Sequence, residues 1–130
     1  MKKLFIILAV IALVMGCTER QPSLFRQAWE LIESNPDSAK VILTKVRPNS
    51  LSESGKAEYG LLKTIADYKT LGTIKNDSLI SASIAYYDRH GDDWHRGRAH
   101  LYRGALRMYR PHNIPNAILD TIVARSSCNG

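Results

Sequence analysis

Apolar residues recur every three or four positions along most of this 130-residue chain, and this spacing is typical of helices that bury one face. Proline, glycine or asparagine interrupts the pattern at intervals, which indicates several short helices joined by turns. The sequence contains no alternating, β-branched stretch long enough for a strand. It therefore predicts an all-α fold.

The expected helices share an apolar stripe and a start marked by a capping residue, a proline or an acidic residue. They cover residues 24–34, 36–47, 52–71, 76–90 and 92–110, and a sixth begins at Asn116. Ser52 is the expected N-cap of the third helix, and Gly72 its expected end. Asp77 and Ser78 are likewise interpreted as helix caps rather than as catalytic groups.

The first sixteen residues have a different pattern. Two lysines precede an apolar run over residues 4–14, which is too short for a spanning helix of roughly 20 residues and has the layout of a secretory signal. Gly16 stands directly before Cys17, so the segment resembles a bacterial lipoprotein signal. The resemblance implies cleavage after residues 1–16, a lipid on Cys17 and a short tether over residues 17–23.

The residues after Cys17 bear on location. In such lipoproteins an aspartate directly after the cysteine implies retention in the inner membrane, and Thr18 stands there instead. The resemblance therefore implies a lipid anchor in the outer membrane, facing the periplasm. Glu19 is a weak version of the acidic cluster that marks export to the cell surface, so the surface is the alternative. The alternative to lipidation is an ordinary signal peptide or an uncleaved anchor.

Residues 17–130 are enough for one small domain. They carry sixteen of the eighteen Lys and Arg residues and all twelve Asp and Glu residues, which is a mildly basic balance. Once Cys17 is lipidated, Cys128 is the only other thiol. An intramolecular disulfide is then excluded, and stability has to come from packing.

The helix starts recur along the chain. Asp37-Ser38 is repeated as Asp77-Ser78 forty residues later, and Pro115-Asn116-Ala117 resembles the segment 36–39. A period near forty with two helices per unit is typical of an α-solenoid, whose units bury their apolar faces by stacking.

Five segments in this order resemble the tetratricopeptide-repeat (TPR) lipoproteins of Gram-negative bacteria: residues 35–39, 57–62, 76–80, 85–87 and 98–104. The period departs from the thirty-four residues usual for TPR proteins. The resemblance implies antiparallel helix pairs stacked as a short TPR-like α-solenoid of about two and a half repeats over residues 24–118, with an irregular tail over 119–130. It also implies a shortened relative of a longer protein, or a chain whose open edge a partner covers. Ala57, Ala66, Ala99 and Gly104 are the expected close-packing positions.

The sequence offers little catalytic chemistry. Asp88, His90, Asp92, Asp93 and His95 lie within eight residues, but around Gly91 they are better interpreted as a helix end, a turn and a helix start than as a metal site. No nucleophile with a base, phosphate-binding loop or paired catalytic carboxylates is evident. We therefore expect neither an enzyme, a metal nor a cofactor.

Arginines are concentrated over residues 89–110. Arg96, Arg103 and Arg107, with Arg110, share one helical face by their spacing. A solvated outer face is the preferred interpretation, and the alternative is a strip that binds an acidic peptide, an anionic polymer or anionic lipid head groups. Arg96, Arg103 and Arg107 are the candidate partner-binding residues.

Together these features predict a membrane-anchored scaffold or adaptor in the cell envelope that holds proteins or peptides in a concave groove on the first helix of each repeat. Nucleic acid is disfavoured by the compartment, and no small-molecule substrate is evident. Two alternatives stay open. In the first, the chain is the N-terminal sensory or regulatory part of a longer signalling protein. In the second, it is an accessory lipoprotein of glycan uptake that binds sugar with its Trp and Tyr residues.

Overall fold

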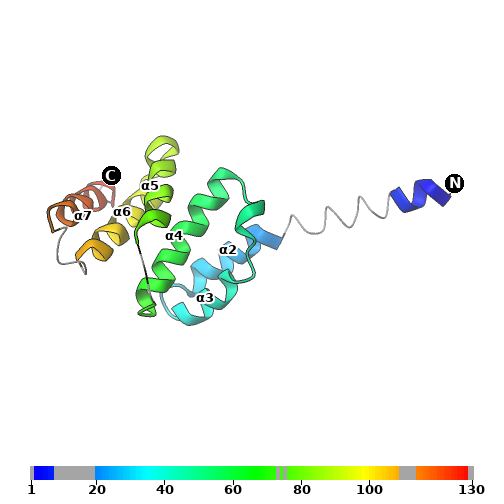
Figure 1. Cartoon of the computed structure of the whole chain (residues 1–130), viewed down its shortest axis with the longest axis horizontal. Helices are drawn as coiled ribbons and strands as arrows, with labels where there is room; N and C mark the ends of the chain where they lie inside the picture. Colours follow the sequence, from blue (N-terminus) through cyan, green and yellow to red (C-terminus); the bar gives the residue numbers. More distant parts are fainter. Residues whose placement is uncertain (1, 8–19, 73, 75, 109–113, 129–130) are drawn as a thin grey trace.

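The computed structural model describes residues 2–7, 20–72, 74, 76–108 and 114–128 (Figure 1). Residues 2–7 are helical. The further elements are α2 (Arg20–Leu31), α3 (Pro36–Leu43), the 3₁₀ helix η1 (Pro48–Ser50), α4 (Glu53–Lys69), α5 (Ser78–His90), α6 (Asp93–Met108) and α7 (Ile114–Cys128). Within these residues the regular structure is helical throughout, so the predicted all-α class is confirmed.

The N-terminal prediction is tested only where the structure describes the chain. Cys17 and most of the expected signal segment lie outside the described residues. The expected tether over residues 17–23 is wrong from Arg20 onward, because α2 begins there. Pro22 is tolerated in a first helical turn, and Gln21 Nε2 donates a hydrogen bond of 2.9 Å to Ser50 Oγ in η1. In the described ranges, no helix combines the length and the apolar character that crossing a bilayer requires.

Side chains begin several helices as the local sequence indicates. Ser52 Oγ accepts a hydrogen bond from Gly55 N at 3.2 Å, which confirms the predicted cap of α4. Asp92 Oδ1 accepts from His95 N at 2.8 Å at the start of α6. Asp77 is the N-cap residue of α5, as predicted, but its side chain makes no capping bond, and Asn76 Oδ1 accepts from Ser78 N at 3.1 Å instead.

Two predicted helix ends are also wrong. α3 ends at Leu43, where Thr44 Oγ1 donates back to the carbonyl of Val41 at 2.6 Å. The expected irregular tail over residues 119–130 is helical as far as Cys128, because α7 continues through it. Polar residues there do not end the helix, since Ala124 and Ser127 are buried and lie against α6 at Gly97.

The helices pack on their neighbours in chain order. α2 packs on α3, α4 on α5 and α6 on α7, and these pairs are joined where α4 meets α3 and α6 meets α5. α4 also contacts both α2 and α6. Figure 1 shows α4 in the middle, with α2 and α3 on one side and α5, α6 and α7 on the other.

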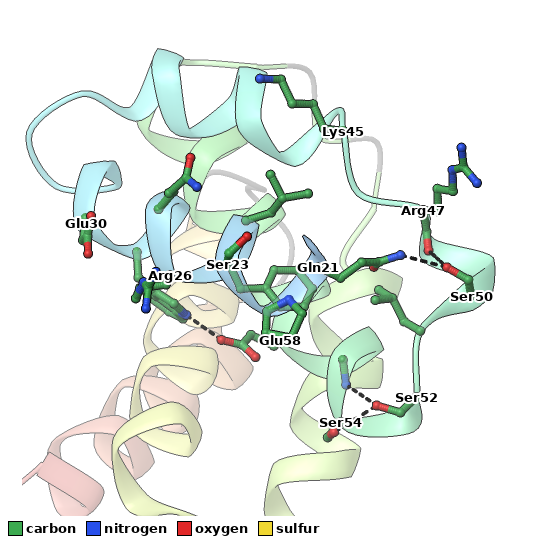
Figure 2. Close-up of a pocket in the computed structure, with 17 residues that line it drawn as sticks. Gln21, Ser23, Arg26, Glu30, Lys45, Arg47, Ser50, Ser52, Ser54 and Glu58 are labelled. Carbon is green, nitrogen blue, oxygen red and sulfur yellow. Dashed lines mark hydrogen bonds between the residues drawn. The ribbon is translucent and has the colours of Figure 1, made fainter. Parts of the chain in front are cut away.

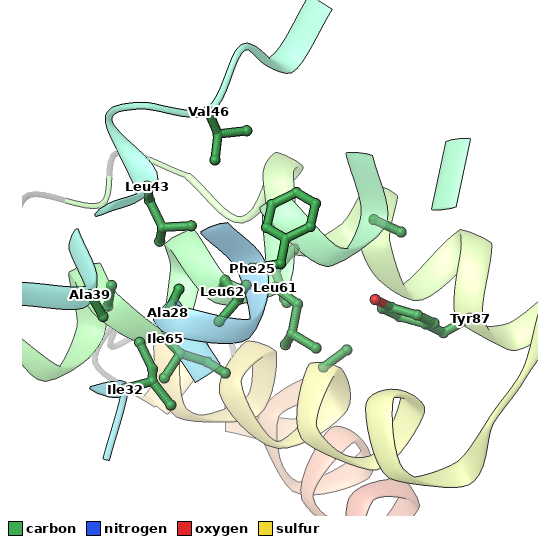
Figure 3. Close-up of a cluster of buried hydrophobic side chains, with 14 of the residues drawn as sticks. Phe25, Ala28, Ile32, Ala39, Leu43, Val46, Leu61, Leu62, Ile65 and Tyr87 are labelled. Atoms are coloured by element: carbon green, nitrogen blue, oxygen red, sulfur yellow. The ribbon is translucent and has the colours of Figure 1, made fainter. Parts of the chain in front are cut away.

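α4 provides the centre of the core. Leu61, Leu62, Ile65 and Ala66 are fully buried. Figure 3 shows side chains from α2, α3 and α5 around them. These surrounding residues are Phe25, Ala28, Ile32, Ala39, Leu43 and Tyr87, with Val46 from the segment after α3. One apolar cluster therefore joins α2, α3, α4 and α5, and it extends to α6 through Ala99.

Two glycines allow helices of a pair to approach closely. A Cβ added to Gly60 of α4 would overlap Ser83 Oγ of α5 and lie 3.2 Å from the carbonyl oxygen of Leu79. A Cβ added to Gly97 of α6 would lie 3.2 Å from Ser127 Cβ of α7. The small residues expected at close-packing positions, Ala57, Ala66, Ala99 and Gly104, are buried as well.

Alanine at these two glycines should have different effects. Gly60→Ala is expected to lower the free energy of unfolding by about 1 kcal/mol, because overpacking costs of ~1–3 kcal/mol exceed the helix-propensity gain of ~1 kcal/mol. Gly97→Ala meets only contacts of 3.2–3.3 Å and should be close to neutral. Equal losses in both variants, measured by circular dichroism in urea, would contradict the packing described for Gly60.

The α4–α5 connection contains a strained residue. Leu71, rather than the expected Gly72, has the left-handed conformation with φ of 52°, and its side chain is 90% exposed. Leu71→Gly should raise the free energy of unfolding by about 0.5–1 kcal/mol, because glycine removes the left-handed penalty at a smaller entropic cost. Leu71→Ala keeps the strain and is the control. A thermal midpoint of Leu71→Gly no higher than that of Leu71→Ala would refute this account.

Candidate interaction surface

The predicted binding arginines lie on the side of α6 that meets α5 and α7, and side chains of the domain are near each of them. Arg96 Nη2 lies 2.7 Å from Asp93 Oδ1, and Arg96 Nε lies 3.4 Å from Ser127 Oγ of α7. Arg107 Nε donates to Asp77 Oδ2 at 2.9 Å, which joins α6 to the start of α5. Arg103 Nη2 lies 3.4 Å from His100 Nδ1. These contacts give Arg96 and Arg107 a role in holding α6 against its neighbours, and a partner-binding role for the strip stays a prediction.

The acidic and histidine cluster around Gly91 is divided among separate contacts. His95 Nδ1 lies 2.6 Å from Asp92 Oδ2, and His100 Nε2 lies 3.1 Å from Asp88 Oδ1. Burial would raise the pKa of Asp92, but the bonds from the His95 backbone and side chain hold it below its ordinary value. In the part of the chain that the structure describes, no three His, Cys, Asp or Glu side chains converge as metal ligands.

A group of aromatic and charged side chains joins α2, α4 and α6. The Trp29 and Trp94 ring centroids lie 4.9 Å apart in an edge-to-face arrangement. Trp29 Nε1 donates to Glu58 Oε1 of α4 at 2.8 Å, the bond beside Glu58 in Figure 2. The Arg98 guanidinium lies 4.6 Å from the Trp94 ring centroid, within cation–π range. We call Trp29, Glu58, Trp94 and Arg98 the tryptophan cluster.

Ion pairs extend this connection toward the end of α4. Glu33, in the turn after α2, accepts from Lys69 Nζ at 2.7 Å and from Arg98 Nη1 at 3.1 Å. The hydrogen bond from Lys69, and then that from Arg98, holds the pKa of Glu33 below its ordinary value. The same bond to Glu33 raises the pKa of Lys69. The three helices expected to line a groove are therefore tied together, and side chains of α2 and α6 meet across that side of α4.

Sequence reasoning missed the tryptophan cluster. Trp29 fits the apolar stripe of the helix expected over residues 24–34, but the pattern has no local signal that pairs it with Trp94, far along the chain. In the structure Trp94 is half exposed, and Trp29 is partly buried.

A cleft lies beside the start of α2, between that helix and the connection from α3 to α4 (Figure 2). Its walls include Leu24, Phe25 and Leu51. Its rim carries charges of both signs from Arg26, Glu30, Lys45, Arg47 and Glu58. The Oε1 atom of Gln21 is buried here without a hydrogen-bond partner among the described residues. The mixed rim defines no ligand class.

Comparisons with protein-family models, with curated proteins and with solved structures found no match for this chain. Its function is therefore inferred from its own residues and geometry.

The Glu33 ion pairs predict a pH-dependent contribution to stability. Because the pKa of Glu33 is lowered in the folded chain, the contribution is present above its unfolded value near 4.5 and is lost as the pH falls through the lower folded value. Glu33→Gln should lower the free energy of unfolding at pH 7 by no more than about 1 kcal/mol, since the pairs are partly exposed and screened. The difference from the natural chain should shrink toward pH 3.

Glu30→Gln is the matched control, because Glu30 is exposed nearby on α2. Urea midpoints of the three chains at both pH values test the prediction. A Glu33→Gln effect that is independent of pH, or an equal effect of Glu30→Gln, would refute it.

Proposed function

We propose that this chain is a lipid-anchored envelope protein whose helical repeat module binds other proteins. The observation that carries the proposal is the order of packing. α2, α4 and α6 each pair with the helix that follows; in addition α2 packs on α4, and α4 packs on α6. Stacked helix pairs in this order expose a long side surface, which such proteins use for binding.

The packing supports a TPR-like α-solenoid as the arrangement of the pairs. The main helix contacts are between elements adjacent or next but one along the chain, as expected for stacked repeats. Gly60 against Ser83 and Gly97 against Ser127 are equivalent crossings of a first helix with its second helix. Because α7 extends to Cys128, the module has three helix pairs rather than the two and a half expected.

The anchor is proposed from the sequence. The apolar run over residues 4–14 followed by Gly16-Cys17 resembles a lipoprotein signal, and cleavage there would leave a lipid on the first residue. α2 begins at Arg20, so the repeat module would lie close to the bilayer. We place the anchor in the outer membrane, with the module in the periplasm.

Binding of protein is favoured by the side chains that α6 exposes. Trp94 is half exposed beside Arg98, and Trp and Arg are enriched in the parts of interfaces that contribute most to affinity. Further along α6, Leu101 and Met108 are exposed too. A protein or peptide surface matches this combination better than a nucleic acid does.

Metabolic labelling with a clickable fatty acid tests the anchor. The natural chain should incorporate label and fractionate with outer membranes, while Cys17→Ala should lose both properties because the acylated thiol is gone. Cys128→Ser is the control and should keep the label. An unlabelled natural chain, or label that survives Cys17→Ala, would overturn the proposal of a lipid-anchored scaffold.

A further inference from the structure

In the first two helix pairs, one side of the first helix packs on the first helix of the next pair. On α2 this side carries Phe25, Trp29 and Ile32, spaced by four and three residues. Phe25 and Ile32 are buried, and Trp29 donates its hydrogen bond to Glu58 of α4. This side of α2 is covered by α4.

The corresponding side of α4 faces α6. It carries Ala57, Leu61, Thr64 and Tyr68 at helical spacing, and the first three are buried. Tyr68 packs edge-to-face on Tyr102 of α6, with ring centroids 5.6 Å apart. This side of α4 is covered in turn by α6.

On α6 no further helix pair covers the equivalent side among the described residues, and Trp94 on that side contacts Trp29 of α2. Gly60 and Gly97 make the same crossing, so they align the two helices. The alignment places Trp94, Arg98, Leu101 and Ala105 at the positions of Ala57, Leu61, Thr64 and Tyr68, and Met108 lies two turns beyond Leu101 on the same side of the helix. Trp94, Leu101 and Met108 are 49%, 45% and 65% exposed, and we call these three residues the α6 stripe. The surface that stacks pairs within the chain therefore continues onto α6 as exposed apolar side chains, with Arg98 beside Trp94.

The opposite end of the stack has a different character. The side of α2 that faces away from α4 carries Arg26 and Glu30, both exposed. The corresponding sides of α4 and α6 carry buried or partly buried apolar residues such as Leu62, Ile65 and Leu106. Because Arg26 and Glu30 do not complement an apolar stripe, head-to-tail stacking of copies is disfavoured.

We propose that the α6 stripe docks on the α6 stripe of a second copy, with the two helices antiparallel about a two-fold axis at Leu101. The stripe is symmetric about that residue, since Trp94 and Met108 each lie seven positions away. Antiparallel pairing places Trp94 of one copy against Met108 of the other, and sulfur–aromatic contacts are favourable. Both copies use the same patch, so the contact forms a closed dimer and leaves no patch free for a third copy.

The size of the stripe limits the strength of this dimer. Three half-exposed large side chains can bury roughly 300 Å² per copy, against about 800 Å² per partner in a standard interface. The dimer is therefore weak at low concentration in solution and depends on a high local concentration. The proposed lipid anchor would supply that concentration by holding the copies on one surface.

Cysteine cross-linking in cells tests the contact on the full chain. In a Cys128→Ser background, Leu101→Cys should form a disulfide-linked dimer when cells are treated with a mild oxidant, because the two residues meet on the axis. Val41→Cys is the matched control, as Val41 is 60% exposed on α3, away from the stripe. Cys17 is left in place, and the control chain reports any disulfide that Cys17 forms.

The orientation has its own test. Trp94→Cys and Met108→Cys chains expressed together should form mixed dimers several-fold more than either chain alone, and Leu101→Asp in both should abolish them. Circular dichroism should show unchanged helicity in every variant. Three outcomes would each overturn the proposal. The first is equal disulfide linkage of Leu101→Cys and Val41→Cys, and the second is linkage of Leu101→Cys to a different protein. The third is that mixed dimers are no more abundant than single-variant dimers. These outcomes do not depend on labelling of Cys17, so the experiments test the proposed dimer and the proposed lipid anchor independently.

Discussion

The enclosure of α4 is the constraint on which the rest of the structure depends. Four other helices contact it, and its central residues Leu61, Leu62 and Ile65 have no exposed surface. Burial of such side chains contributes about 1.5–3 kcal/mol each, so the neighbouring helices gain most by keeping their positions around α4. Gly60 sets how near α5 can come, because Ser83 and the backbone of Leu79 occupy the space of a side chain.

A second set of contacts acts across α4 rather than on it. Glu33 binds Lys69 of α4 and Arg98 of α6, and Trp29 meets Trp94 of α6. These contacts bring the first and third pairs together on one side of the stack. That side was expected to be a groove, and the tryptophan cluster occupies part of it. The apolar surface that α6 leaves exposed is consequently the stronger candidate for binding.

The parts of the fold that depend on local sequence could be predicted, and the parts that depend on distant contacts could not. Helical spacing and the Ser52 cap are encoded within a few residues. Asp77 has the sequence context of a cap, but Arg107, thirty residues away, takes its carboxylate. Polar residues near Cys128 suggest an irregular tail, yet packing on Gly97 keeps them helical. In the candidate site, the arginines of α6 were visible as a pattern, whereas their partners in α5 and α7 were not.

The difference between the two ends of the stack constrains how such a module can exist in a cell. The proposed solenoid requires polar residues at each end, and α2 supplies them in Arg26 and Glu30. The α6 stripe instead leaves Leu101 and Met108 exposed, and contiguous apolar surface promotes association. If the stripe paired with a different surface of another copy, each addition would leave a new stripe open and a filament would grow. Pairing of the stripe with itself covers both apolar ends at once and leaves the polar ends of two α2 helices facing outward.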